Sequence, residues 1–374
     1  MGLNCGIVGL PNVGKSTIFS ALTSAPALVA NYPFATIEPN VGIVSVPDKR
    51  LYRIAELVKP KKIVPAIVEF VDIAGLVKGA SKGEGLGNQF LSHIREVGAI
   101  VHVVRCFEDS DIVHVSDKID PRSDIETIEI ELALADLDTV EKRSAKAEKL
   151  ARAGDKDVVK LNKALLPLLD QLKGLLGEGR PARALSATPE QRALLADLHL
   201  MTMKAQIFVC NVDEGGLADH LAGRDSAFIR AVREHAANEG SDVTVICGKL
   251  EAEIAGLESE EERQEFLKEV GLEESGLSSL IHAGYHILGL RTFFTAGPDE
   301  ARAWTIDAGD VAPVAAGVIH TDFEKGFIKA EVYHCDDLFE LGSEQRVREA
   351  GKLRMEGREY VVQDGDIMHF RFNA

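Results

Sequence analysis

Short apolar runs rich in β-branched residues alternate along the chain with stretches of helical periodicity. The runs occupy residues 3–8, 66–71, 99–106, 205–210 and 243–247. Runs of this length predict buried strands, and strands that alternate with helices predict a parallel sheet with helices on both faces. The pattern therefore predicts a doubly wound α/β fold.

Residues 125–203 interrupt this alternation. Between Ile125 and Leu176 the chain is almost free of Gly and Pro and is rich in Leu, Ala, Glu and Lys, and the turn-like sequence Ala153-Gly154-Asp155 divides it. Two antiparallel helices need only a short connection. We therefore expect a long helical hairpin inserted between two strands of the sheet.

The pattern changes again after a predicted helix at 277–288. Short strands and turns follow, with strands expected at 291–296, 302–306, 327–334, 360–362 and 367–372. We therefore expect three domains. They are a large α/β domain over 1–124 and 204–288, an inserted helical or coiled-coil domain over 125–203, and a small mixed α+β domain over 289–374.

Composition narrows the class of protein. The chain has 374 residues, 45% of them hydrophobic, and no apolar run approaches the length that spans a bilayer. The first six residues lead directly into a glycine-rich loop and leave no room for a signal peptide, so we expect a cytosolic protein. Five cysteines without C-x-x-C spacing indicate neither a disulfide framework nor a zinc site.

Charge is distributed unevenly. The formal net charge of -17 argues against a protein that coats nucleic acid through overall electrostatics. Residues 141–163, at the hairpin tip, nevertheless carry eight basic and four acidic side chains, a local excess of 8 - 4 = +4. One interpretation is a solvated helical surface. The other is a basic finger that contacts ribosomal RNA through Lys142, Arg143, Lys146 and Lys149.

Residues 9–16 carry the clearest chemistry. They match the pattern G-x-x-x-x-G-K-[ST], follow a predicted strand and open a predicted helix. In such a P-loop the backbone N–H groups and the helix N-terminus surround the phosphates, and the lysine adds a full positive charge. The candidate nucleotide-binding residues here are Asn12, Val13, Gly14, Lys15, Ser16 and Thr17.

A magnesium site is expected beside this loop. Asp72 opens the sequence Asp72-Ile73-Ala74-Gly75, a D-x-x-G pattern in which the aspartate holds magnesium and the glycine N–H senses the γ-phosphate. Thr36 lies in an irregular stretch between the two motifs and offers a second hydroxyl ligand. We therefore expect Ser16, Thr36 and Asp72 to hold Mg²⁺.

The nucleotide base should be read after the strand at 205–210. Guanine specificity normally uses N-K-x-D, but this chain has Asn211-Val212-Asp213-Glu214, without the lysine and with Glu214 in place of aspartate. A bidentate pair is worth on the order of 1–3 kcal/mol of base discrimination, so its loss removes the expected preference for guanine. Asn211, Val212 and Glu214 are the candidate base-site residues.

Together these motifs resemble the Obg-like ATPase family, also called YchF, in the translation-factor class of P-loop proteins. The resemblance covers the whole chain and extends to Gly-Glu-Gly-Leu-Gly-Asn at 83–88 and His-Thr-Asp-Phe-Glu-Lys-Gly-Phe at 320–327. It implies a preference for ATP over GTP and a helical domain inserted in the nucleotide-binding domain. It also implies a C-terminal TGS domain of ubiquitin-like shape and association with the ribosome, chiefly the large 50S subunit.

The position that normally orients the attacking water is occupied by Leu76, which cannot hydrogen-bond. Turnover should therefore be slow unless another group replaces it, and the resemblance points to His114. The alternative for His114 is a surface histidine without a role. Lys15 and Gly75 complete the predicted catalytic set, and Asn12 matches a loop asparagine that binds K⁺ in some related GTPases.

Three functions compete on this evidence. The first is a slow, Mg²⁺-dependent ATPase that acts on the ribosome as a conformational switch, as a cytosolic monomer without membrane contact. The second is a ribosome or RNA adaptor in which nucleotide is a largely structural ligand, which Leu76 favours. A kinase of a small metabolite is disfavoured, because D-x-x-G and N-x-x-E are typical of switch proteins.

Overall fold

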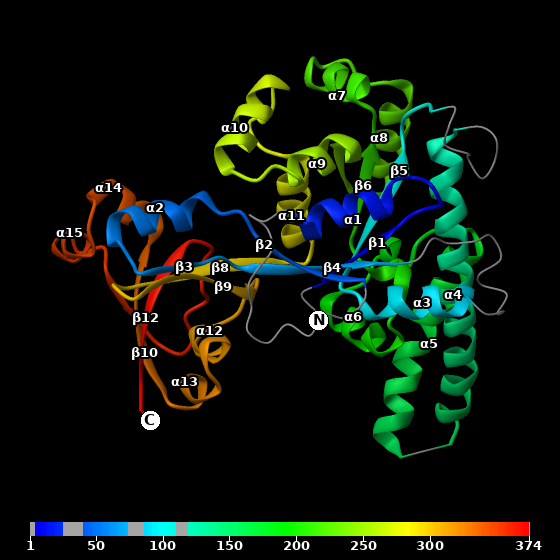
Figure 1. The fold of residues 1–374 in the computed structure, drawn as a ribbon. Helices are drawn as coiled ribbons and strands as arrows, with labels where there is room; N and C mark the ends of the chain where they lie inside the picture. The colour runs from blue at the N-terminus through cyan, green and yellow to red at the C-terminus, as the bar shows by residue number, and fades with distance from the viewer. Residues whose placement is uncertain (1–3, 25–39, 74–85, 110–118, 154, 374) are drawn as a thin grey trace. The chain divides into compact units, whose positions relative to one another are not determined.

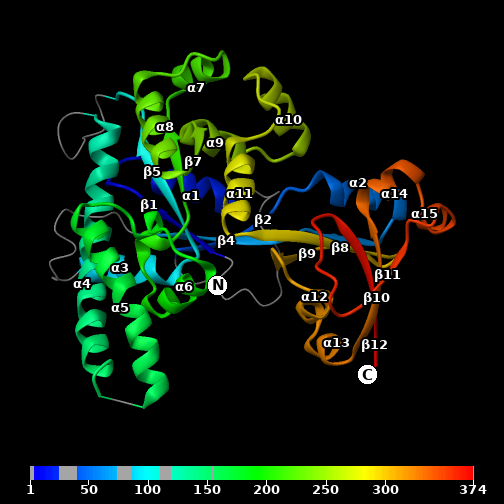
Figure 2. The same ribbon diagram turned by 180° about the vertical axis from the view of Figure 1, so that it is seen from behind.

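The computed structural model describes residues 4–24, 40–73, 86–109, 119–153 and 155–373, which form two compact units (Figures 1 and 2). Within the described residues, the first unit contains 4–24, 40–42 and 69–279. The second contains 43–68 and 280–373. None of the described helices combines the length and apolar character needed to cross a bilayer.

A six-stranded sheet has the order β2-β4-β1-β5-β6-β7, with β1, β5, β6 and β7 wholly in the first unit. Their bounds are β1 Asn4–Val8, β2 Val41–Ser45, β4 Ile67–Asp72, β5 Ala99–Arg105, β6 Gln206–Asn211 and β7 Asp242–Ile246. The pairs from β4 to β7 are all parallel. Every residue of β5 and β6 is buried, as expected for central strands covered on both faces. The doubly wound α/β prediction is confirmed.

Four helices join successive strands of this sheet, namely α1 Lys15–Ser24, α3 Leu86–Glu96, α7 Glu214–Leu221 and α8 Ala227–Glu239. Three more follow β7, namely α9 Gly248–Ala255, α10 Glu260–Glu269 and α11 Gly276–Ile287, and α11 continues into the second unit from residue 280 onward. Apolar side chains from β5, β6, α8 and α9 pack into one buried core, which includes Phe208, Ile229 and Leu250. This packing fixes the loops that follow β6 and β7.

The inserted hairpin consists of α4 Pro121–Leu150 and α5 Lys156–Gly177, and the chain returns through α6 Pro189–Leu195 and short 3-10 turns. The helix starts before the predicted residue 125, because Asp120 caps it through Ser123 N and Pro121 occupies the first turn. Buried Asp136 on α4 accepts bonds from the backbone N–H groups of Met201 and Thr202 and from the Thr202 hydroxyl. This carboxylate anchors the returning chain to α4.

The second unit is built on a mixed sheet in the order β11-β10-β12-β8-β9-β3. The strands are β3 Lys62–Val64, β8 Leu290–Ala296, β9 Glu300–Asp307, β10 Phe327–His334, β11 Arg354–Glu356 and β12 Asp366–Phe372. The helices are α2 Lys49–Val58, α12 Ala312–Ile319, α13 Thr321–Lys325, α14 Cys335–Leu341 and α15 Glu344–Glu349. The ubiquitin-like TGS assignment stays a prediction.

Three features of this unit differ from the sequence-based expectation. No strand forms at 360–362, where Val361 makes only an isolated bridge to Val311. β11 was not predicted. The segment 43–68, expected in the nucleotide-binding domain, contributes β3 and α2 to the second unit, and β3 pairs with β9 in parallel. A three-residue strand has no readable periodicity, so the sequence could not reveal this pairing.

All five cysteines are free and buried. Buried thiols of this kind pack as small apolar side chains.

Glu251 on α9 is a buried carboxylate that joins two helices. Its Oε1 accepts a bond of 2.7 Å from Gly276 N at the start of α11, while its buried Oε2 has no hydrogen-bond partner among the described residues. Burial raises the pKa of Glu251 to about 7. The native state therefore holds a proton on this carboxyl at pH values where the unfolded chain has released it.

We expect the free energy of unfolding to fall as pH rises between about 4.5 and about 7, since the native state binds the extra proton only below its raised pKa. The Glu251→Gln variant, which carries no titrating group there, should show a flatter profile and a relative gain of up to about 3 kcal/mol at pH 8. Chemical denaturation at pH 5, 6, 7 and 8 measures this. Glu253→Gln, on the exposed side of α9, is the control, and parallel profiles for Glu251→Gln and wild type would contradict the prediction.

Candidate nucleotide-binding site

The loop between β1 and α1 has the backbone of a phosphate-binding loop. Asn12 and Gly14 adopt φ angles of 63° and 96°, in the left-handed region that favours glycine. A Cβ atom at Gly14 would lie 2.2 Å from Asn211 Nδ2, so the second glycine of the motif is required on steric grounds as well. The Val13 side chain is buried, whereas those of Asn12, Ser16 and Thr17 are exposed.

Lys15 lies folded over this loop. Its Nζ donates to Gly9 O at 3.0 Å and to Leu10 O at 2.8 Å, and the residue is buried. An ammonium has three donors, so one N–H remains for a phosphate oxygen. Burial lowers the pKa of Lys15, and the nearby Asp72 carboxylate opposes that shift.

Asp72, at the end of β4, lies beside the loop because Asp72 pairs with Ile7 of β1. Burial raises its pKa, while Lys15 and a hydrogen bond from Ser16 oppose the shift. The Oδ1 atom of Asp72 is shielded from solvent and has no hydrogen-bond partner among the described residues. An orphaned carboxylate oxygen next to a serine hydroxyl offers the hard oxygen donors that Mg²⁺ prefers, so Ser16 and Asp72 fit the predicted metal site.

Three predicted site residues lie outside the described residues. They are the metal ligand Thr36, the γ-phosphate sensor Gly75 and the catalytic candidate His114. Their predicted roles stay predictions.

Arg105 was not identified from the sequence. This buried arginine ends β5, and it donates to Phe107 O at 3.2 Å and to Asp109 O at 3.1 Å. The guanidinium also lies over the Phe107 ring, 4.8 Å from its centroid. These contacts fix the backbone that leads toward the segment carrying His114.

Asn211 connects the phosphate loop with the loop after β7. Its Nδ2 donates to Val13 O and its Oδ1 accepts from Gly248 N, both at 2.9 Å, and the side chain is buried. The sequence predicted a base-reading asparagine, whereas its first role in this structure is to brace two loops. The neighbouring Val212 side chain belongs to the apolar core, so only its backbone is available to a ligand.

Glu214 begins α7 and pairs with a residue that the sequence analysis missed. Its Oε1 lies 2.9 Å from Nζ of Lys249, which follows β7. The two residues are far apart in sequence and are brought together because β6 and β7 are adjacent parallel strands. A lysine immediately after Cys247-Gly248, at the end of a predicted strand, was the available signal.

The basic residues of the hairpin differ in their partners. Lys142 pairs with Asp138 at 2.6 Å on the helix surface, and Arg143 donates to Asn162 Oδ1 on the facing helix at 3.1 Å. Lys146 and Lys149 are exposed. Arg143 therefore has a structural role between α4 and α5, which makes it a weaker candidate for external contact than the three lysines.

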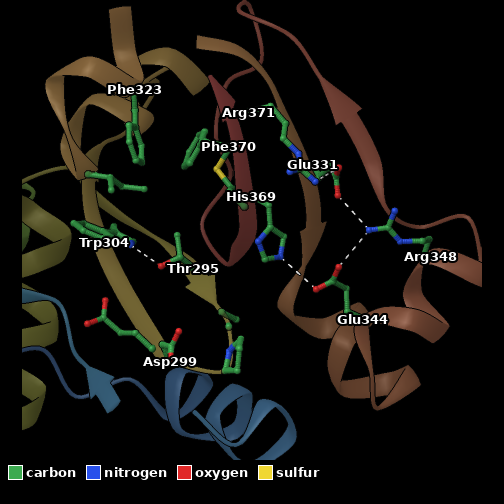
Figure 3. Close-up of a pocket in the computed structure, with 16 residues that line it drawn as sticks. Thr295, Asp299, Trp304, Phe323, Glu331, Glu344, Arg348, His369, Phe370 and Arg371 are labelled. Atoms are coloured by element: carbon green, nitrogen blue, oxygen red, sulfur yellow. Dashed lines mark hydrogen bonds and ion pairs between the residues drawn. The ribbon is translucent and has the colours of Figure 1, made fainter. Parts of the chain in front are cut away.

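A separate cleft of about 610 Å³ lies between the ends of β8 and β12 in the C-terminal unit (Figure 3). Aromatic side chains form one part of its lining, and ion pairs join the charged residues of the other part (Figure 3). The ion pairs are His369–Glu344, Arg348–Glu344, Arg348–Glu331 and Arg371–Glu331, at 3.1 to 3.4 Å. Both arginines have carboxylate partners and His369 lies against Glu344, so this set indicates a structural network.

Known proteins match the chain along its whole length. The family profile described as 50S ribosome-binding GTPase matches residues 4–152, and the YchF GTPase C-terminal profile, described as a protein of unknown function, matches residues 290–373. The chain is 56% identical to the ribosome-binding ATPase YchF of Bacillus subtilis (strain 168) and 53% identical to that of Escherichia coli O157:H7. Both matches cover 374 residues and 100% of each chain.

A solved structure agrees with this match. The Schizosaccharomyces pombe YchF GTPase is 39% identical and superimposes with a TM-score of 0.89, covering 99% of this chain and 98% of that one. The similarity therefore includes the fold of both units.

We expect Gly14→Ala to weaken ATP binding at least tenfold, because the new Cβ would displace Asn211 and the loop that it braces. Isothermal titration with ATP and Mg²⁺ measures the loss. Gly174→Ala in α5, where no atom lies within 4 Å of the added Cβ, is the matched control and should bind ATP as wild type does. Retention of wild-type affinity by Gly14→Ala would contradict the steric argument.

Proposed function

Because the chain belongs to the YchF family of P-loop nucleoside triphosphate hydrolases, we propose that it is a ribosome-binding, Mg²⁺-dependent ATPase that prefers ATP to GTP. The observation that carries the proposal is the grouping of Lys15, Ser16 and Asp72 at the phosphate loop, in a chain matched end to end by relatives named ribosome-binding ATPases. Mg²⁺ bound by Ser16, Asp72 and Thr36 would neutralise phosphate charge in the transition state.

The preference for ATP is supported by the base site. The lysine of N-K-x-D is absent, and the glutamate that replaces its aspartate is engaged by Lys249. A guanine-reading carboxylate needs both oxygens for the N1–H and the exocyclic amine. Glu214 offers one oxygen to Lys249, so it is poorly suited to that task.

We assign hydrolysis a switching role. Thr36 and Gly75 are the proposed sensors of the γ-phosphate, and Leu76 makes turnover slow. In the sequence, the segment 43–68 lies between Thr36 and Asp72, and it packs within the same compact unit as the C-terminal sheet. A change at both sensors would therefore act on a segment that belongs to the same compact unit as the C-terminal sheet.

The proposed ribosome contacts are the basic hairpin tip and the C-terminal unit, with the large 50S subunit as the main partner. Lys142, Lys146 and Lys149 present their charges on the surface of α4. We further propose a cytosolic monomer, with Asn12 as a candidate K⁺ ligand. A comparison of hydrolysis in potassium and sodium salts tests the role of K⁺.

An adaptor function, with nucleotide as a structural ligand, is the second candidate, and Leu76 favours it. Ribosome affinity in ATP, ADP and no nucleotide separates the two functions, because a partner indifferent to the state of the protein cannot read a switch. A switch predicts at least a fivefold difference between nucleotide states. Equal affinity in all three would leave the adaptor.

We expect reversal of Lys142, Lys146 and Lys149 to Glu to lower 50S affinity at least tenfold and to reduce its salt dependence, since three phosphate contacts are lost. Co-sedimentation with 50S subunits at two salt concentrations measures both effects. Reversal of Arg224, Arg230 and Lys268, three exposed cations of the same unit, is the matched control. Unchanged binding by the hairpin variant would assign the main contact to another surface.

We expect His114→Ala to lower ATP turnover at least tenfold and to leave ATP affinity unchanged, because the imidazole is proposed to orient the attacking water and not to bind the base or phosphates. Phosphate release and ATP titration on the same preparation separate turnover from affinity, and parallel assays with GTP test base preference. His93→Ala, at an exposed position of α3, is the control. Unchanged turnover would remove His114 from the mechanism.

A further inference from the structure

The ion pair between Glu214 and Lys249 joins the segments that follow β6 and β7, beside the proposed base site. Glu214 opens α7 directly after β6, and Lys249 lies in the first turn of α9 directly after β7. Asn211 and Ile246 are register partners in these parallel strands, so both loops emerge at the same edge of the sheet. In open α/β sheets ligands bind outside the carboxyl ends of the strands.

Both charged side chains are accessible to a ligand. The Glu214 side chain is 58% exposed and that of Lys249 is 74% exposed, while Asn211, between them and the phosphate loop, is buried. The hydrogen bond to Glu214 raises the pKa of Lys249, and Glu253, one turn further along α9, acts in the same direction. Lys249 therefore keeps its ammonium charge at neutral pH.

Asn211 retains hydrogen-bonding capacity beside this pair. One Nδ2–H bonds to Val13 O and one Oδ1 lone pair accepts from Gly248 N. A second N–H and a second lone pair remain on the same amide. An asparagine amide with one donor and one acceptor matches the N7 and N6 groups of adenine.

The ion pair matches the other edge of the same base. On its Watson–Crick edge, adenine presents an N6–H donor next to the N1 acceptor, whereas guanine presents the O6 acceptor, the N1–H donor and an N2–H donor in that order. A Lys–Glu pair offers one donor next to one acceptor. With Glu214 at the 6-substituent and Lys249 at N1, the pair complements adenine, whereas guanine would place its O6 against the carboxylate and its N1–H against the ammonium.

We propose that Lys249 determines base specificity by donating to adenine N1 while Glu214 accepts from the N6 amine, and by occupying one of the two Glu214 carboxylate oxygens that guanine would require. This inference rests on the proposed preference for ATP and supplies its chemical basis. Sites built around a specific hydrogen bond reject ligands that leave their polar groups unpaired.

The fold does not depend on this pair. Exposed ion pairs contribute little to stability, because solvent screens the charges and two long side chains must be ordered. Lys249→Met keeps most of the aliphatic stem and removes the charge. The variant should therefore melt within a degree or two of wild type, so that a change in nucleotide affinity reports on the base site.

The experiment compares ATP, GTP and 1-deaza-ATP, in which a C–H group replaces the N1 acceptor, by titration in the presence of Mg²⁺. Wild type should bind 1-deaza-ATP about tenfold more weakly than ATP, as expected for one lost hydrogen bond to a charged donor. Lys249→Met should bind ATP about tenfold more weakly than wild type and should no longer distinguish ATP from 1-deaza-ATP. Its ratio of GTP to ATP affinity should rise by about the same factor.

Lys268→Met, at an exposed position of α10 in the same unit, is the matched control and should reproduce wild type. If wild type prefers ATP and Lys249→Met binds all three nucleotides as wild type does, the role of Lys249 is excluded while the ATP preference stands. Equal loss with 1-deaza-ATP in variant and wild type would also exclude it. If wild type binds ATP and GTP equally, the proposed base preference fails, and the role of Lys249 fails with it.

Discussion

The side chain of Asn211 holds the nucleotide site together. Its amide bonds the phosphate loop on one side and the loop after β7 on the other, in a position that is closed to solvent. The arrangement forces the residue opposite to be glycine, since a Cβ at position 14 would overlap the amide nitrogen. The phosphate loop and the proposed base site are thus parts of one rigid assembly, because the same side chain bonds the phosphate loop and the loop after β7.

Much of this assembly could be predicted from local sequence. The phosphate loop, Ser16 and Asp72 follow from short motifs whose chemistry requires fixed spacing, and the structure brings them together beside β1 and β4. The parallel sheet follows from apolar runs separated by helices. The hairpin was predicted because a long stretch with few helix breakers has few alternatives, although its start shifted to the cap at Asp120.

Other features depend on contacts between residues distant in sequence. Lys249 gains meaning only when β6 and β7 place it against Glu214, and neither residue carries a motif that includes the other. The bonds of Asn211 to the two loops could not be predicted from the sequence either, since an asparagine is expected at this position for base recognition alone. Val361 pairs only with Val311, and a single bridge without neighbouring pairs does not make a strand. Thr36, Gly75 and His114, which would complete the catalytic site, lie outside the described residues.

The pairing of β3 with β9 has a consequence for synthesis of the chain. Lys61 binds Asp299 across a separation of 238 residues, and the adjacent strands pair from Lys62 and Glu300 onward. During translation at roughly 5–20 residues per second, β3 would wait for about 12–48 s before β9 is made. Throughout that interval the connection between β2 and β4 has an unpaired strand. The second sheet therefore gains its edge strand β3 only when most of the protein has been synthesised.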